Sequence, residues 1–140
     1  MQNRDRSIVS LALLLASFAA CTSGTGDTDG GPGIEATLSS LRENIFSPNC
    51  SANACHGGDN PVHGLDLASD DPHGRLVDQD STIAGVKLVV AGDPENSLLF
   101  LAVSEGYEAG SIRKMPPGVD LSEEKIDALR QWIEDGAADD

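Results

Sequence analysis

The stretch CSANACHGG, residues 50–58, is the part of the chain around which the rest is organised. Cys50 and Cys55 are followed directly by His56, and two cysteines closed by a histidine are typical of covalent haem attachment. In such a site both thiols add to vinyl groups of the haem, and the histidine reaches the iron from one face. The usual pattern has two residues between the cysteines, whereas this chain has four. The rest of the chain therefore has to support a haem site.

The same residues leave two other chemistries open. Cys50 and Cys55 can close a short loop as a structural disulfide. A Cys-Cys-His zinc site would need a fourth ligand, such as His63 or His73, and neither of these has a paired spacing. Thiols exported without metal also tend to oxidise, so zinc is the least favoured of the three.

The first 33 residues have the composition of an export signal and a tether. Arg4 and Arg6 precede a short uncharged run of Leu, Ala and Ile, which ends in small residues before Cys21. This predicts a signal peptide over residues 1–20, too short to be a membrane span. The order FAAC at its end resembles a bacterial lipobox, in which Cys21 is lipidated; an ordinary secretory signal is the alternative. Residues 21–33 would then be the lipidated cysteine and a flexible tether rich in Gly, Asp and Thr.

The charge of the chain excludes some partners and favours others. Its net charge is −14, and removal of residues 1–20 takes away Arg4, Arg6 and Asp5, which leaves −15. Such a charge repels nucleic acid and anionic lipid head groups. It suits solubility, and it also suits a partner protein with a basic docking face.

Residues 34–140 are expected to form one mainly helical domain. Apolar side chains at helical spacing predict helices over 34–46, ended by Pro48, over 97–106 with Ser97 as N-cap, and over 121–136. Val86–Val90 is the only β-like run. Large side chains are few, so the apolar core is thin, and a haem would supply a flat surface on which the three helical stripes could close.

Five pieces of this domain, taken in order, resemble class I c-type cytochromes, and more closely the planctomycete-type cytochrome c domains of exported bacterial proteins. They span the whole domain from about Ile34 to Ala137. The matching pieces are Phe46 to Cys50, Cys55-His56-Gly57, Ala91 to Leu99 (AGDPENSLL), Met115-Pro116-Pro117 and Trp132 to Ala137 (WIEDGA).

The resemblance implies an all-α, class I cytochrome c-like fold around one covalent haem c, with long loops. It implies that Cys50 and Cys55 are the thioether anchors, His56 the proximal iron ligand and Met115 the distal one. The Trp132-bearing helix would pack beside the ring. Arg113 and Lys114 are most simply surface charges, although haem propionates would give them partners. His63 and His73 are expected to be solvated.

The expected function is that of a monohaem electron carrier, exported, lipid-anchored to a membrane and facing the periplasm, with redox proteins as partners. An imidazole opposite a thioether suits electron transfer, and two axial protein ligands leave no open position for catalysis at the iron. An enzyme is therefore not expected. The alternative is a non-haem structural or binding lipoprotein held by a Cys50–Cys55 disulfide.

Overall fold

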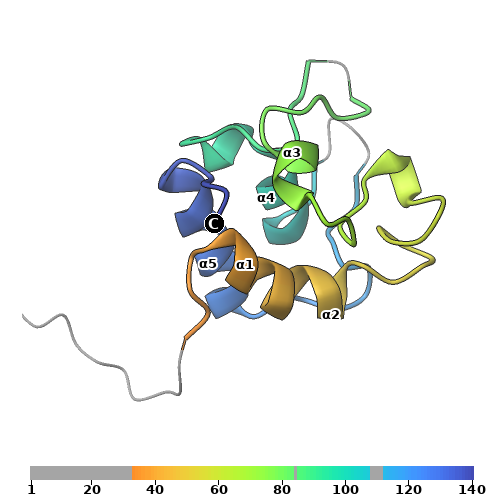
Figure 1. Cartoon of the computed structure of the whole chain (residues 1–140), viewed down its shortest axis with the longest axis horizontal. Helices are drawn as coiled ribbons and strands as arrows, with labels where there is room; N and C mark the ends of the chain where they lie inside the picture. The colour runs from red at the N-terminus through yellow and green to blue at the C-terminus, as the bar shows by residue number, and fades with distance from the viewer. Residues whose placement is uncertain (1–32, 84, 108–111) are drawn as a thin grey trace, which may run out of the picture. The chain divides into compact units, whose positions relative to one another are not determined.

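Short helices joined by long loops make up the part of the chain that the computed structural model describes, residues 33–83, 85–107 and 112–140 (Figure 1). These residues belong to one compact unit. The expected signal peptide, Cys21 and the tether up to residue 32 lie outside the described residues. None of the described helices has both the length and the apolar character that crossing a membrane requires.

The first helix continues beyond residue 46, where the sequence pattern predicts its end. Thr37 caps its start, because the Thr37 hydroxyl accepts a hydrogen bond from Ser40 N at 3.2 Å. A turn with π-type hydrogen bonding separates two α-helical turns. The successive segments are α1 (Leu38–Leu41), η1 (Arg42–Phe46) and α2 (Ser47–Asn49).

Pro48 lies inside the last turn of this helix and does not stop it, so that expectation was wrong. Proline has no N–H, and the carbonyl of Asn44 loses its ordinary helical partner there. The side chain of Asn49 compensates, because its Nδ2 donates to Ile45 O at 2.9 Å and to Asn44 O at 3.4 Å. The helix can therefore continue up to the residue before Cys50.

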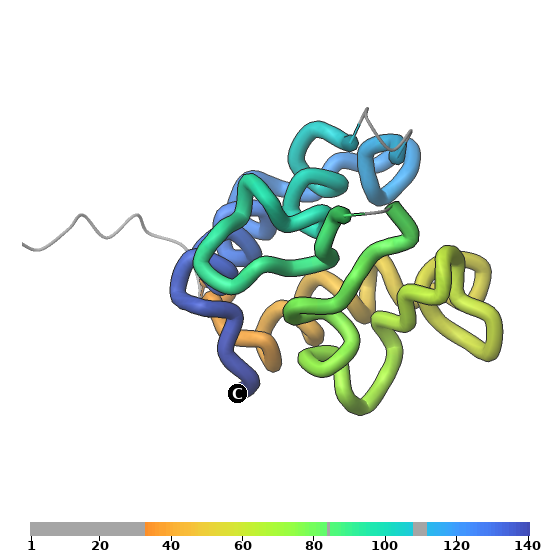
Figure 2. Tube along the Cα trace, turned by 90° about the horizontal axis from the view of Figure 1, so that it is seen from above, coloured from red at the N-terminus to blue at the C-terminus, as the bar shows by residue number. Residues whose placement is uncertain are grey.

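The middle of the chain contains little regular structure. Short helical turns interrupt it at η2 (Val62–Gly64), α3 (Pro72–Leu76) and η3 (Pro94–Asn96). The β-like run forms isolated bridges only, Val77 with Val89, Asp80 with Lys87, and Lys87 with Ser97. Figure 2 shows the segment 85–97 folding back beside α4 and α5, where Leu99 N bonds to Leu88 O and Gly92 N to Ile133 O.

Ser97 occupies the N-cap position of α4 (Leu98–Ser104), but its hydroxyl does not cap the helix as expected. The side chain makes no capping bond to the helix. It is fully buried, donates to Asp93 O at 2.8 Å and accepts from Val90 N at 2.8 Å. Ser97 therefore fastens the start of α4 to the extended segment that precedes it.

The last helix, α5 (Glu123–Glu134), follows the sequence pattern closely. Ser122 occupies the N-cap position without a side-chain capping bond, and the first turn is acidic, as the helix dipole favours. Gly136 has φ of 100° directly after the C-cap, a conformation that glycine adopts without strain.

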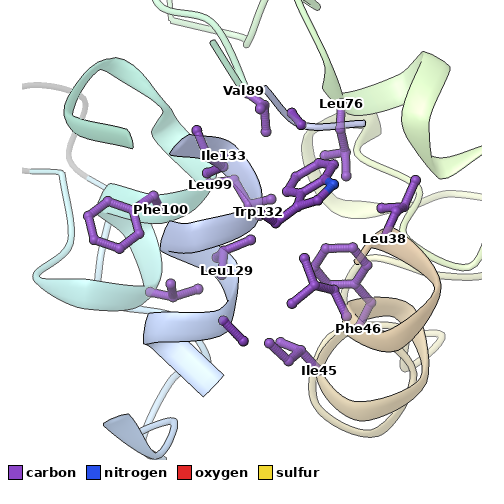
Figure 3. Close-up of a cluster of buried hydrophobic side chains, with 14 of the residues drawn as sticks. Leu38, Ile45, Phe46, Leu76, Val89, Leu99, Phe100, Leu129, Trp132 and Ile133 are labelled. Carbon is purple, nitrogen blue, oxygen red and sulfur yellow. The ribbon is translucent and has the colours of Figure 1, made fainter. Parts of the chain in front are cut away.

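The packed core lies between the first helix and α5, with Trp132 at its centre. Figure 3 shows the Trp132 ring between Leu38 and Phe46 of the first helix and Leu129 of its own helix. The ring is 1% exposed, and its Nε1 donates to Ala138 O at 2.9 Å. The C-terminal tail is tied down here as well, because Leu38 N donates to Asp140 Oδ1 at 2.6 Å.

Candidate functional site

A cavity of about 650 Å³ opens beside α4. Its volume is within the range of about 300–1,000 Å³ that small-molecule and cofactor sites occupy. Its wall is mainly apolar, with a group of polar residues along one part. The residues that line it include Cys50, His56, Leu88, Leu99, Met115 and Arg75.

Three of the four residues expected to hold a haem lie on this wall. Cys50, His56 and Met115 all line the cavity, although Met115 is far from the other two in the sequence. Cys55 is half-buried and does not appear on the wall. The structure therefore brings one cysteine, the histidine and the methionine together, and leaves the second cysteine beside the site.

The cysteine loop is held by its own backbone. His56 N donates to Cys50 O at 3.1 Å, and Cys55 N donates to Ala52 O at 2.8 Å. Gly57 is buried, and a Cβ added to it would run into the carbonyl oxygen of Ser51. The loop therefore closes this tightly only with glycine after the histidine.

His56 is placed by backbone contacts and keeps an unpaired ring nitrogen. Leu67 N donates to the His56 carbonyl at 2.8 Å, and this bond fixes the main chain. Its Nδ1 is buried and has no hydrogen-bond partner in the described part of the chain. Burial lowers the pKa of the imidazole, and the backbone of Leu65 and Val62 opposes that shift. A neutral imidazole is the form that binds metal ions.

The thiol of Cys50 is partly withdrawn from solvent. Burial raises its pKa to about 11, although the positive charge of Lys125 acts in the other direction and Cys55 adds to the rise. Its Sγ lies 3.7 Å from Ile45 O, the carbonyl that Asn49 also binds. Both Cys50 and Cys55 are free thiols in the structure.

Met115 lines the cavity from a loop that is far from Cys50 and His56 in the sequence. Its backbone N donates to Ala102 O at 2.7 Å, so the Met-Pro-Pro loop is tied to the last turns of α4. The side chain is half-buried and packs against the apolar core. A half-buried thioether on a cavity wall can contact a ligand there, which a fully enclosed methionine cannot.

Of the three helical stripes expected to close on a haem, only that of α4 lies on the cavity wall within the described residues. It is made of Leu98, Leu99, Ala102 and Val103. The apolar faces of the first helix and α5 pack against each other around Trp132, so Trp132 does not line the cavity. The packed core and the cavity therefore share residues of α4, because Leu99 and Val103 belong to both.

The other two histidines do not form a metal site with the cysteines. His63 is exposed on the cavity wall, as expected for a solvated residue. His73 is half-buried, against expectation, because its Nε2 bonds to Ala137 O at 2.9 Å. Within residues 33–83, 85–107 and 112–140 no cluster of three or more His, Cys, Asp and Glu side chains could hold a metal ion.

Basic residues near the cavity differ from those that the sequence indicated. Arg113 lines the wall, but Lys114 does not, and its Nζ bonds to Asp120 Oδ1 at 2.8 Å. Arg75 lines the wall too, and the sequence analysis missed it. The Asp71-Pro72 pair that starts α3 was the available signal, since Asp before Pro often begins a helix.

Comparisons of this chain with models of protein families, with curated proteins and with solved structures found no match.

Proposed function

We propose that the chain is a monohaem c-type cytochrome that carries electrons, with the haem in the cavity between the cysteine loop, α4 and the Met-Pro-Pro loop. One observation carries this proposal. His56 and Met115, a nitrogen and a sulfur ligand of the kind that bind haem iron, come from distant parts of the chain and line one apolar cavity beside Cys50.

The residues present fit the group in three respects. The cavity has the volume of a cofactor site. Burial favours the neutral form of His56, which is the ligand form. The unpaired Nδ1 of that ring shows that its surroundings in the described residues do not satisfy it. The position of Cys55 beside the wall and the four-residue spacing are the features that differ from the usual pattern.

The haem would supply a one-electron couple, and the chain would supply its surroundings. Cys50 and Cys55 would hold the group covalently through their sulfur atoms. His56 and Met115 would supply a nitrogen and a sulfur ligand to the iron and exclude water and substrate from it. Leu88, Leu99 and Val103 would keep the ring in a medium of low polarity, which tunes the potential.

The test is expression of the full chain in a host with c-type maturation. We expect a coloured protein with the mass of one added haem, which acid-acetone extraction does not remove. Cys50→Ser and Cys55→Ser should each weaken covalent retention. A colourless wild-type protein of unmodified mass, made where a known cytochrome c matures, would refute the proposal. A mass two units below that of the reduced chain would then indicate the disulfide form.

Met115 has a test of its own. Met115→Ala should keep the haem attached but allow carbon monoxide to bind the reduced iron, because the thioether no longer blocks the sixth position. Ile112→Ala is the matched control, since Ile112 also lines the cavity and has no sulfur. If wild type and Met115→Ala bind carbon monoxide equally, Met115 is not a ligand.

The lipid anchor at Cys21 remains a proposal of the same kind, and it would place the domain in the cell envelope. Cys21→Ser should move the protein from the membrane fraction to the soluble fraction. A wild-type protein that is already soluble after export would contradict the anchor and leave an ordinary signal peptide.

A further inference from the structure

Arg75 is held on the cavity wall by the short helix α3. Asp71 caps this helix, because its Oδ1 accepts from Gly74 N at 2.9 Å, and Pro72 takes the first helical turn, where a missing N–H costs nothing. Leu76 at the end of α3 is fully buried and fastens the helix to the core. Arg75 itself is exposed and lines the cavity.

The guanidinium of Arg75 is oriented but not neutralised. Its Nε donates to Ser69 Oγ at 2.9 Å, and the same hydroxyl accepts from Asp71 N at 3.2 Å. None of the ion pairs among the described residues involves Arg75. With Nε bound to Ser69, the two terminal nitrogens still have four N–H groups to donate. Two such groups in one plane match a carboxylate.

Arg75 carries a positive charge on this part of the wall in a strongly acidic chain. Asp80 lies on the same wall, but its Oδ1 is 2.7 Å from Lys87 Nζ, so that carboxylate already has a partner. Neutral polar residues complete this stretch, namely Gln79, Ser81 and Thr82. Away from this stretch the wall is mainly apolar, although His56, His63 and Arg113 also lie on it. The cavity is therefore amphipathic, and it suits a flat apolar ligand with an acidic edge.

We propose that Arg75, oriented by Ser69, binds a carboxylate of the ligand and so determines which edge of the haem faces the stretch 75–82. This inference rests on the proposed function. A propionate would accept two hydrogen bonds from the guanidinium and remain ionised. The positive charge would also disfavour the oxidised, more positive haem, because like charges repel more strongly away from bulk water. Arg75 would therefore raise the reduction potential.

The first experiment compares three forms of the haem-bearing full chain by redox titration. Arg75→Gln should retain the haem and shift the reduction equilibrium about tenfold toward the oxidised form, which is about 59 mV for one electron. Arg42→Gln removes the same charge from an ion pair with Asp70 outside this cavity, and should shift it less than twofold. Arg75→Lys should lie between wild type and Arg75→Gln, because it keeps the charge and loses the fork.

Two further measurements separate carboxylate binding from a structural effect. Ser69→Ala should lower the potential in the same direction and by less, since it frees the guanidinium without removing it. The haem-free full chain should bind protoporphyrin IX more weakly after Arg75→Gln, by fluorescence titration. Binding of the dimethyl ester, which has no carboxylate, should not change.

The outcomes distinguish this inference from the proposed function. A haem-bearing Arg75→Gln protein with the potential of Arg42→Gln, or equal loss of affinity for protoporphyrin and its ester, would overturn the role of Arg75 and leave the cytochrome proposal intact. A wild-type chain without haem would overturn the cytochrome proposal itself. If Arg75→Gln does not fold, Arg75→Lys and Ser69→Ala still decide the question.

Discussion

Two regions that meet at α4 differ in how their apolar side chains are covered. In one region, the first helix and α5 bring their apolar faces together, and Trp132 fills the space between them to 1% exposure. In the other region, the α4 side chains Leu99 and Val103, which also belong to the packed core, line a cavity of about 650 Å³. Protein interiors are normally close-packed. A cavity of this volume with a mainly apolar wall is of the kind that small-molecule and cofactor sites occupy in proteins.

The largest loss of stability should follow a change at the centre of the packed core, at Trp132. Trp132→Ala should lower the free energy of unfolding by about 3–5 kcal/mol, because it leaves a large void and removes the donor to Ala138 O. Chemical denaturation of the purified protein would measure it. Trp132→Phe should cost clearly less; if the two variants cost the same, the filling of this space is not what stabilises the core.

The same truncation in the packed core and on the cavity wall compares the two regions directly. Leu129→Ala, at a position with no exposure, should cost about 2–5 kcal/mol. Leu88→Ala, on the cavity wall and half-buried, should cost less in haem-free protein, because fewer atoms lose a contact. With haem bound, the cost of Leu88→Ala should rise. Equal costs for both variants in haem-free protein would mean that the cavity side is already filled.

A third change acts on the cysteine loop itself. Gly57→Ala forces a methyl group against the Ser51 carbonyl, and we expect a loss of about 1–3 kcal/mol together with less attached haem. Gly33→Ala is the control, since its Cβ would make only an ordinary contact with Glu124. Haem content by absorbance and stability by thermal melting would be measured on both, and a normal haem content in Gly57→Ala would show that the loop can open without loss.

The smallest expected effect concerns the end of the first helix. Asn49→Ala removes the donor to Ile45 O and Asn44 O, and should cost about 1 kcal/mol. Asn60→Ala, in an exposed loop, is the control and should change little. Since the same turn leads into Cys50, Asn49→Ala should also speed alkylation of that thiol in haem-free protein. An unchanged alkylation rate would mean that the end of the helix does not determine how accessible the Cys50 thiol is.

Local sequence patterns predicted individual helices and loops, but not which of their side chains meet in the folded structure. The stripe of α5, the glycine after it and the loop around Met115 could be read from periodicity and from proline and glycine positions. The end of the first helix could not, because Pro48 is accommodated by a π-type turn and by the side chain of Asn49. The hydroxyl of Ser97 was assigned to its own helix, whereas its partners lie in the preceding segment.

By itself, the sequence determined the helical character of the domain, its acidity and the pairing of Cys50, Cys55 and His56 in one short loop, because these depend on neighbouring residues alone. Only the tertiary structure decided that Met115 and Arg75 line the same cavity as His56 and that Trp132 does not. Periodicity says that a helix has an apolar face, but not which neighbour covers it. Which neighbour covers the face depends on how side chains from distant segments pack together. Here the apolar faces of the first helix and α5 pack around Trp132, whereas the α4 stripe also lines the cavity.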